Sequence, residues 1–480
     1  MHVGWLIAQG QRLYRDFAED HAPFLFVILS WLLPERGTPS MPLLDVLTYL
    51  ARARAVMVAC GLVTLASAGA IVYRATRSVF ASLVTAGTLA GSYWVWHEAL
   101  TRVRNDPPAL ALFWLGVALL LARSERPLNR HLLAGAGLGL TVAAALWNPK
   151  MPVECLVVGA VYLWKLKDAY RGGGIRHLAA AVAPAIVIIA VAVACIASVT
   201  SLGDYVFFTF TYNVFIADVL AERGLRDGLK PFEHCDAAFK GVWPLLAIAV
   251  ASLILFVRKV RSRIRSLDFA IYAFVYAIVL AAAIDIRFIF SYPDLAPQYY
   301  LMWAIALATL YGMTAAAALE FVRNEQWTAR LQVTTAIVVT VGVIAVMVWK
   351  AASSPSWVPI KYMQKRLRPG ETVLVSAELH PIAAYDASYY WFVFDVIVPA
   401  AMRHTERDAS SPLPRVRPED SPICRAERGL EPRLRFVSEA AVDVLPQTRR
   451  CFDRMRAAGR VVRTPVWSVW DLRPEPSRTR

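Results

Sequence analysis

Residues 179–200 read AAAVAPAIVIIAVAVACIASVT, a run without a single charged side chain. About 20 apolar residues in a helix match the roughly 30 Å thickness of a bilayer's hydrocarbon core. Similar runs lie near residues 50–73, 79–96, 106–122, 131–147, 151–165, 241–257, 267–286, 298–320 and 331–350. The sequence therefore predicts an all-α polytopic membrane domain of about ten transmembrane helices over residues 50–350.

The overall composition agrees with a membrane protein. The chain of 480 residues is 57% hydrophobic and 18% charged, and its mean hydropathy is +0.46. A water-soluble protein with this balance would expose apolar surface that it could not bury. The net charge of +15 is concentrated in short loops between the apolar runs, as is typical of loops that face anionic lipid. This distribution argues against nucleic acid as a partner.

The loops between the predicted helices alternate in character. One set is short and basic, and its members include Arg74, Arg123, Lys165, Arg258 and Arg323. The other set is mixed in charge and rich in polar and aromatic residues; it comprises residues 97–105, 148–150, 201–240 and 287–297. The positive-inside rule places the basic set in the cytoplasm and the other set outside. We therefore expect a multi-pass protein of the plasma or inner membrane with both visible termini outside.

The first 49 residues are predicted to be an external loop with interfacial helices. The apolar run at residues 24–33 reaches only about 15 Å as a helix, which is too short to cross the hydrocarbon core. An external terminus without a preceding span is hard to insert. We therefore expect a first transmembrane helix upstream of Met1 in the complete protein.

The polar tail at residues 355–480 has a different composition, rich in Arg and Pro. Strand-like runs occupy residues 371–375 and 463–470, and residues 449–459 form a predicted helix that ends at Gly459. These features predict a small extracytoplasmic α/β domain.

The six cysteines do not form an obvious framework. Cys60, Cys155 and Cys195 lie in apolar runs and are expected to behave as small hydrophobic residues. Two interpretations of Cys424 and Cys451 remain open. They form a disulfide if the tail lies on the oxidising side of the membrane, or they are unpaired thiols.

Polar side chains collect in the outward-facing segments, and these are the candidates for chemistry. Ionisable groups at this depth are costly and usually functional. The candidate catalytic carboxylates are Asp16, Glu19 and Asp106. The candidate substrate-binding residues are His21, Arg104, Lys150, Gln298 and Tyr299. Cations can hold a phosphate, and a carboxylate can take a proton from an attacking hydroxyl. A divalent metal is compatible with this set, although the sequence assigns it no ligands.

Each candidate also has an ordinary structural interpretation. Asp106 precedes Pro107, which is a good helix start, and Arg104 can pair with it locally. Lys150 can extend to lipid head groups. Gln298 and Tyr299 fit an aromatic belt. Asp16 and Glu19 can be plain interfacial charges, and His21 can simply end a loop, so the whole set is more informative than any one member.

The first external segment, residues 5–17 followed by Glu19 and His21-Ala22-Pro23, resembles the first external loop of polytopic GT-C glycosyltransferases. Within that family it is similar to the group of the dolichyl-phosphate-mannose protein mannosyltransferases and aminoarabinose lipid A transferases (glycosyltransferase 39-like). The segments Arg104-Asn105-Asp106, 135–150 and Pro297-Gln298-Tyr299-Tyr300 also resemble that group. The resemblance covers roughly residues 1–350, and the tail corresponds in position to the family's extracytoplasmic domain.

The resemblance implies an inverting transferase that takes a sugar from a polyprenyl-phosphate donor. The acceptor would be a lipid, a glycan or a protein at the outer face of the membrane. By the same matching, His21 falls where relatives place a phosphate-contacting residue, while Arg104, Asp106 and Lys150 support the lipid phosphate or the catalytic loop. The family's carboxylate at the end of its first span has no counterpart in this chain, except that Asp16 could replace it.

The alternatives are an inactive or truncated transferase and a transporter or lipid-carrier flippase. A transporter would more often show paired halves with broken helices at mid-membrane. The sequence shows no such symmetry, and its polar residues cluster on one predicted side.

Overall fold

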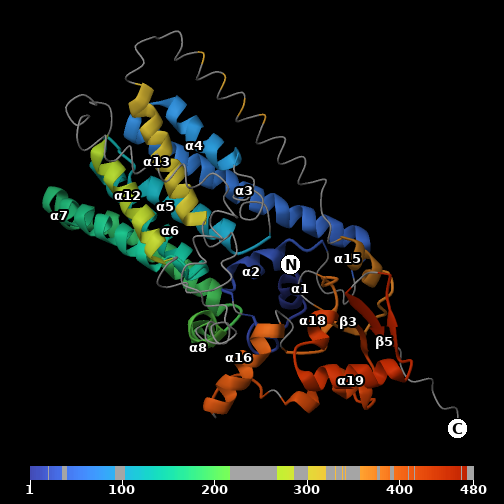
Figure 1. Ribbon diagram of the computed structural model, residues 1–480. Helices are drawn as coiled ribbons and strands as arrows, with labels where there is room; N and C mark the ends of the chain where they lie inside the picture. Colours follow the sequence, from blue (N-terminus) through green and yellow to red (C-terminus); the bar gives the residue numbers. More distant parts are fainter. Residues whose placement is uncertain are drawn as a thin grey trace. The chain divides into compact units, whose positions relative to one another are not determined.

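The computed structural model divides the chain into two compact units, which are described separately (Figure 1). Unit 1 comprises Met1–Ala53, Cys195–Gly224 and Ser354–Arg480, and unit 2 comprises Arg54–Ala194 and Leu225–Ser353. The structure describes residues 1–19, 21–34, 41–91, 103–213, 215–216, 268–285, 301–319, 330, 334, 338, 341, 357–375, 379–389, 394–408, 410–415, 417–465 and 468–472.

Helices make up the described part of unit 2. They are α3 (Leu43–Thr76), which begins in unit 1, α4 (Val79–Gly91), α5 (Asp106–Leu120), α6 (Pro127–Trp147), α7 (Pro152–Ala197), which ends in unit 1, α12 (Phe269–Ile284) and α13 (Leu301–Leu319). Three of them, α3, α6 and α7, are long and apolar enough to cross a membrane, and the other four are shorter apolar helices. These lengths and compositions indicate a membrane protein. The predicted span at 241–257 lies outside the described residues. So does the predicted span at 331–350, except for residues 334, 338 and 341.

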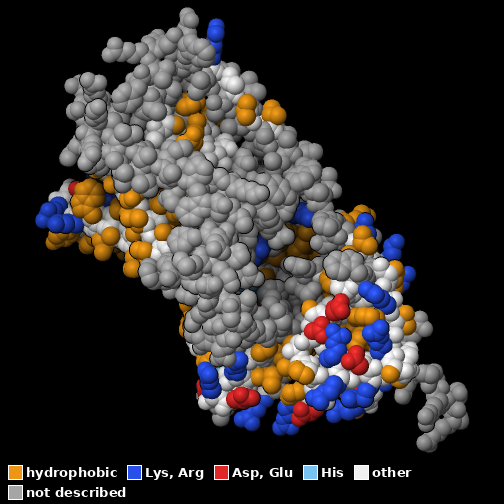
Figure 2. Space-filling view, in the orientation of Figure 1, with side chains coloured by type: hydrophobic (Ala, Val, Ile, Leu, Met, Phe, Trp, Pro, Cys, Tyr) orange, Lys and Arg blue, Asp and Glu red, His pale blue; other side chains and the backbone are white. Residues whose placement is uncertain are grey.

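The element α7 contains two helices that meet at Gly174, where the backbone is non-helical (φ 60°, ψ −151°). The Tyr162 hydroxyl donates to the backbone oxygen of Ala181 at 3.1 Å, although 19 residues separate them, so the chain reverses between the two helices. This agrees with the prediction of two separate helical runs at 151–165 and 179–200, and the three consecutive glycines between them allow the reversal. Many large apolar side chains of α7 are exposed, among them Leu156, Trp164 and Ile186. Figure 2 shows this apolar surface, which lipid would cover.

Small residues allow the helices of unit 2 to approach closely. A Cβ atom added to Gly116 of α5 would lie 2.6 Å from the carbonyl oxygen of Gly137 in α6. A Cβ on Gly135 would lie 2.0 Å from the carbonyl oxygen of Ala181 in α7. Such contacts between small residues are how membrane helices pack without a hydrophobic driving force. The Gly-rich segment of α6 therefore has a packing role.

Unit 1 contains short helices and one mixed sheet. The helices are α1 (His2–Ala8), α2 (Phe24–Trp31), α8 (Leu202–Val206), the π-helix η2 (Phe207–Thr211), α15 (Trp357–Gln364), α16 (Phe394–Arg407), the 3₁₀ helix η7 (Pro418–Asp420), α17 (Pro422–Glu427), α18 (Glu439–Val442) and α19 (Pro446–Ala457). The strands are β1 (Thr372–Leu374), β2 (Tyr385–Asp386), β3 (Leu434–Ser438), β4 (Val461–Arg463) and β5 (Val469–Leu472). The sheet order is β2-β1-β3-β5-β4, with parallel pairs β1–β2 and β1–β3 and antiparallel pairs β3–β5 and β4–β5.

The sheet has apolar residues on both faces because side chains alternate along each strand. On one face Val437 packs with Phe452 and Met455 of α19. On the other face Phe436 packs with Met363 of α15. The predicted strand at 371–375 corresponds to β1. The single strand predicted at 463–470 is wrong. Its first residue ends β4 and its last two begin β5, because Pro465 lies in the turn between these strands.

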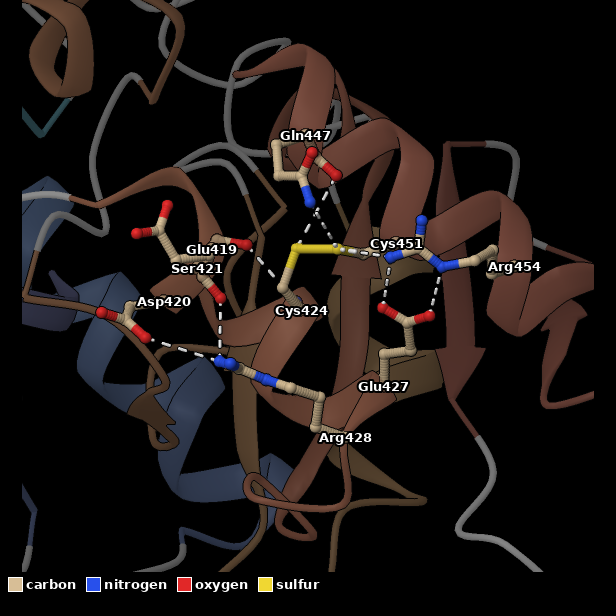
Figure 3. Close-up of a disulfide and its surroundings, with 9 residues drawn as sticks. All are labelled: Glu419, Asp420, Ser421, Cys424, Glu427, Arg428, Gln447, Cys451 and Arg454. Carbon is tan, nitrogen blue, oxygen red and sulfur yellow. Dashed lines mark hydrogen bonds and ion pairs between the residues drawn. A yellow bond between two sulfur atoms is a disulfide. The ribbon is translucent and has the colours of Figure 1, made fainter.

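A disulfide between Cys424 and Cys451 joins α17 to α19, with the two Cα atoms 5.2 Å apart (Figure 3). Arg454 and Glu427 form a two-point ion pair beside it, and Arg428 donates to the backbone oxygen of Glu419 at 2.8 Å. Of the two interpretations left open for these cysteines, the structure supports the disulfide. Such bonds persist in oxidising compartments.

The N-terminal segment and the tail belong to the same unit, although they were predicted as separate domains at 1–49 and 355–480. Trp5 of α1 packs against Tyr385 of β2, with ring centroids 5.0 Å apart. The backbone nitrogen of Ala18 donates to the backbone oxygen of Tyr389 at 2.8 Å. Helix α2 has 8 residues and is mostly buried within unit 1, whereas the sequence predicted an interfacial helix at residues 24–33.

Candidate functional site

Four helix ends of unit 2 meet at one group of polar residues. Helix α5 begins at Asp106, and a short turn connects the end of α6 to the start of α7. In that turn the side-chain amide of Asn148 donates to Asp106 Oδ1 at 3.0 Å. The backbone nitrogen of Val153 donates to Oδ2 of Asp285, which follows α12, at 3.3 Å. The turn at residues 148–153 therefore links the carboxylates of α5 and α12, and we call this group the acidic end of unit 2.

Asp106 is buried, and both of its carboxylate oxygens have a partner. Its second oxygen, Oδ2, lies 3.6 Å from Nε of Arg104. Pro107 and Pro108 follow it in the first turn of α5, where proline suits a helix start and a carboxylate complements the helix dipole. Asp106 is therefore held so as to orient Arg104 and Asn148. The backbone nitrogen of Lys150 donates to Asn148 Oδ1 at 3.3 Å, so Lys150 belongs to the same turn.

Two further carboxylates, Glu154 and Asp285, were not among the predicted site residues. They are 1% and 2% exposed, and their side chains hydrogen-bond to each other, which requires a proton between the two carboxyl groups. Apart from this mutual hydrogen bond, Glu154 Oε2 and Asp285 Oδ1 have no partner within the described residues. Two buried acids that depend on each other are costly, so such pairs usually serve a function. The available signal was that Glu154 is the only acidic residue in the apolar run 151–165.

Three predicted site residues lie in unit 1, and two of them meet. Glu19 is buried, and its Oε1 lies 2.6 Å from Nδ1 of His21. Asp16 is tied locally instead, through the side chain of Arg15 and the backbone nitrogen of Arg12. The hydrogen bond from Arg15 lowers the pKa of Asp16 below its usual value. Asp16 is thus a surface carboxylate with local partners, whereas Glu19 and His21 form a mostly buried pair.

The predicted residues are thus divided between the two units. Arg104, Asp106 and Lys150 come together in unit 2, and Glu19 and His21 come together in unit 1. Gln298 and Tyr299 lie outside the described residues.

A third cluster joins α1 to β2 in unit 1. His2, His380 and Asp386 place their ligand-type atoms within 4.8 Å of one another. His2 Nε2 lies 2.5 Å from Asp386 Oδ2, and His380 Nε2 lies 3.1 Å from Asp386 Oδ1. Burial, followed by the charge on His2, lowers the pKa of His380 to about 4. Burial opposes ionisation of Asp386, but His2 and His380 outweigh it and lower the pKa of Asp386 to about 2.

The hydrogen bonds of this cluster do not suit a metal ion. The backbone nitrogen of Ile382 donates to His380 Nδ1 at 3.1 Å, so the neutral ring of His380 carries its proton on Nε2 and gives it to Asp386. His2 Nδ1 faces the backbone oxygen of Ile382 at 2.7 Å and carries a proton, and the 2.5 Å contact of its Nε2 with Asp386 Oδ2 requires a second proton. A metal would need both Nε2 atoms as lone-pair donors. The cluster is better described as a network of hydrogen bonds that attaches α1 to the tail.

Comparisons with known proteins add no family. No model of a known protein family matches the chain, and no curated protein matches it. The functional argument therefore depends on the geometry of the acidic end of unit 2 and on the chemistry of its side chains.

Proposed function

We propose that this protein is an inverting glycosyltransferase that moves a sugar from a polyprenyl-phosphate donor to an acceptor at the outer face of the membrane. The observation that carries the proposal is the composition of the acidic end of unit 2. Two cations, Arg104 and Lys150, lie in the same group of helix ends as two buried carboxyl groups, Glu154 and Asp285, which hydrogen-bond to each other. Cations suit a phosphate leaving group, and a carboxylate suits the removal of a proton from an acceptor hydroxyl.

The proposed reaction is a single displacement in which each residue has a separate role. The acceptor oxygen attacks the anomeric carbon, the bond from that carbon to the phosphate oxygen breaks, and the lipid phosphate leaves with the electron pair. Arg104, oriented by Asp106, and Lys150 stabilise the phosphate. The acceptor proton passes to the pair of Glu154 and Asp285, since Asp106 already has partners on both oxygens. Inversion follows because only one displacement occurs.

The support for an outer location of the acidic end comes from charge within unit 2. The opposite ends of the unit 2 helices contain Arg74, Arg123, Arg130 and Lys165, a bias typical of the cytoplasmic side. For unit 1 by itself, the Cys424–Cys451 disulfide suits an oxidising compartment.

A second candidate function is proton-coupled transport of a lipid-linked substrate. The buried pair of Glu154 and Asp285 favours it, because intramembrane carboxylates recur in proton relays. A transporter would move its substrate without breaking the sugar–phosphate bond, so the two functions differ in their products.

The test is a transfer assay with the full-length protein in proteoliposomes and a panel of radiolabelled polyprenyl-phosphate sugars. Asp106→Ala is expected to reduce transfer by about 10²-fold or more while membrane insertion is retained. Glu125→Gln is the matched control, because Glu125 is an exposed carboxylate outside the acidic end, and it should leave the rate unchanged.

Undiminished transfer by Asp106→Ala would refute the role given to the acidic end. If the wild-type protein cleaves none of the donors but moves them across the bilayer, the transport alternative replaces the transferase.

A further inference from the structure

A cavity of about 830 Å³ lies at the basic end of unit 2, away from the acidic end. Each of four helices contributes to both ends. Helix α5 begins at Asp106 and is followed by Arg123; α6 has His131 near its start and is followed by Asn148. Helix α7 has Glu154 in its first turn and Lys165 three turns later, and α12 is capped by Asp268 and followed by Asp285. The 15 residues of α5 alone separate the two ends by about 22 Å.

The walls of the cavity are positively charged. Its charged lining residues are Arg74, Arg123, Arg130, Lys165, Asp168 and Asp268. The two carboxylates are already paired, Asp268 with Arg123 and Asp168 with Arg130 at 3.2 Å. Among the described residues, Arg74 and Lys165 form no ion pair, and Nε of Arg74 is buried without a hydrogen-bond partner. The cavity therefore has two cations to offer an anion.

Most of the other residues that line the cavity are apolar. They include Ala134, Val157, Val161, Ile271 and Phe274. A free inorganic anion would gain nothing from this surface, whereas an acyl or prenyl chain would bury it. The size also lies within the range of cavities that hold small amphiphiles.

We propose that this cavity binds a phosphate-bearing amphiphile, with its phosphate at Arg74 and Lys165 and its apolar chain along α7 and α12. The ligand chemistry is that of an anionic phospholipid or another lipid phosphate. Basic pockets between membrane helices recognise such head groups through charge-assisted hydrogen bonds. The site is separate from the proposed transfer chemistry and does not depend on it.

Lipid binding to the full-length protein in detergent, measured by native mass spectrometry, tests this site. Phosphatidylglycerol and phosphatidylcholine are titrated separately, and inorganic phosphate is added as a competitor. We expect phosphatidylglycerol to bind about tenfold more tightly than phosphatidylcholine. Phosphate at millimolar concentration should displace it only weakly, since it lacks the apolar chain.

Two kinds of variant separate the site from general surface charge. The double variant Arg74→Gln with Lys165→Gln should bring phosphatidylglycerol binding to within about twofold of phosphatidylcholine. Arg126→Gln, an exposed cation of the same basic region that does not line the cavity, should change binding by less than about twofold. Ala277→Phe fills the cavity without changing its charge and should also weaken binding, which provides a test if the double variant does not fold.

Three results would overturn the proposal. One is equal binding of the two phospholipids by the wild-type protein. Another is an equal loss in Arg126→Gln and the double variant, which would indicate general electrostatic attraction. The third is complete displacement by inorganic phosphate with no effect of Ala277→Phe, which would indicate a free-anion site instead of a lipid site.

Discussion

The protein contains two buried polar clusters that differ in how well their atoms are satisfied. In unit 1, both ring nitrogens of His2 and of His380 and both oxygens of Asp386 have hydrogen-bond partners. In unit 2, Glu154 Oε2 and Asp285 Oδ1 have none among the described residues beyond the hydrogen bond between the two side chains. Both clusters are nearly inaccessible to solvent, so exposure does not explain the difference.

This comparison separates a structural use of buried charge from a functional one. A satisfied network fixes one arrangement of the chain and loses stability when a member is removed. An unsatisfied pair reduces stability and is retained where a substrate or a proton completes it. Mutations in the two clusters should therefore have different effects. Mutation of the unit 1 cluster should reduce stability, and mutation of the unit 2 cluster should reduce activity.

The largest expected effect is on activity in unit 2. The double variant Glu154→Gln with Asp285→Asn should reduce sugar transfer by about 10²–10⁴-fold, because it removes the group proposed to take the acceptor proton. Its stability should change by less than about 1 kcal/mol, because neutral amides are less costly to bury than carboxylates. Transfer rates and thermal unfolding of the same preparation test both statements. A stability loss that accounts for the whole loss of activity would assign this pair a structural role.

The next effect is on stability in unit 1. Asp386→Asn should destabilise the unit by about 3 kcal/mol, since an amide cannot accept hydrogen bonds from both histidine rings as a charged carboxylate does. Pulse proteolysis of the full chain across a urea series measures this change. Asp443→Asn is the control, because Asp443 pairs with Arg449 on the surface of the same tail and should contribute less than about 1 kcal/mol. Similar losses in the two variants would mean that burial of Asp386 does not matter.

The smallest effect is the pH dependence of the unit 1 cluster. His380 takes up a proton near pH 6.5 when unfolded but only near pH 4 when folded, so the unfolded state binds more protons between these values. Stability should therefore fall as the pH drops from about 6.5 to 4. Asp386 should add a further loss from about pH 3.8 to 2, where its carboxylate is protonated in the unfolded state first. The same urea series at several pH values tests this, and a flat profile between pH 6.5 and 4 in the wild-type protein would contradict it.

The sequence predicted the features that depend on local patterns. Pro107 marks the start of α5, and α3, α6 and α7 follow apolar runs long enough for a membrane. Arg104 and Asp106 were found because they lie two residues apart. The hairpin of β4 and β5 was missed because a short apolar run does not reveal a reversal at Pro465.

The rest depends on contacts between distant residues. Glu154 and Asp285 lie in the predicted spans 151–165 and 267–286, with two further predicted spans between them, so no local pattern shows that they meet. The partnership of His2 with Asp386 spans 384 positions, and no local periodicity encodes it. Pairing of Cys424 with Cys451 was one of two open interpretations until the fold brought α17 and α19 together.

The docking of α1 onto the tail also sets an order of events during synthesis. His2 is synthesised before its partner Asp386, which follows 384 positions later. At about 5–20 residues per second this delay is roughly 20–80 s. During that interval the apolar face of α1 lacks its final cover, so lipid or a chaperone must shield it until Asp386 has been made.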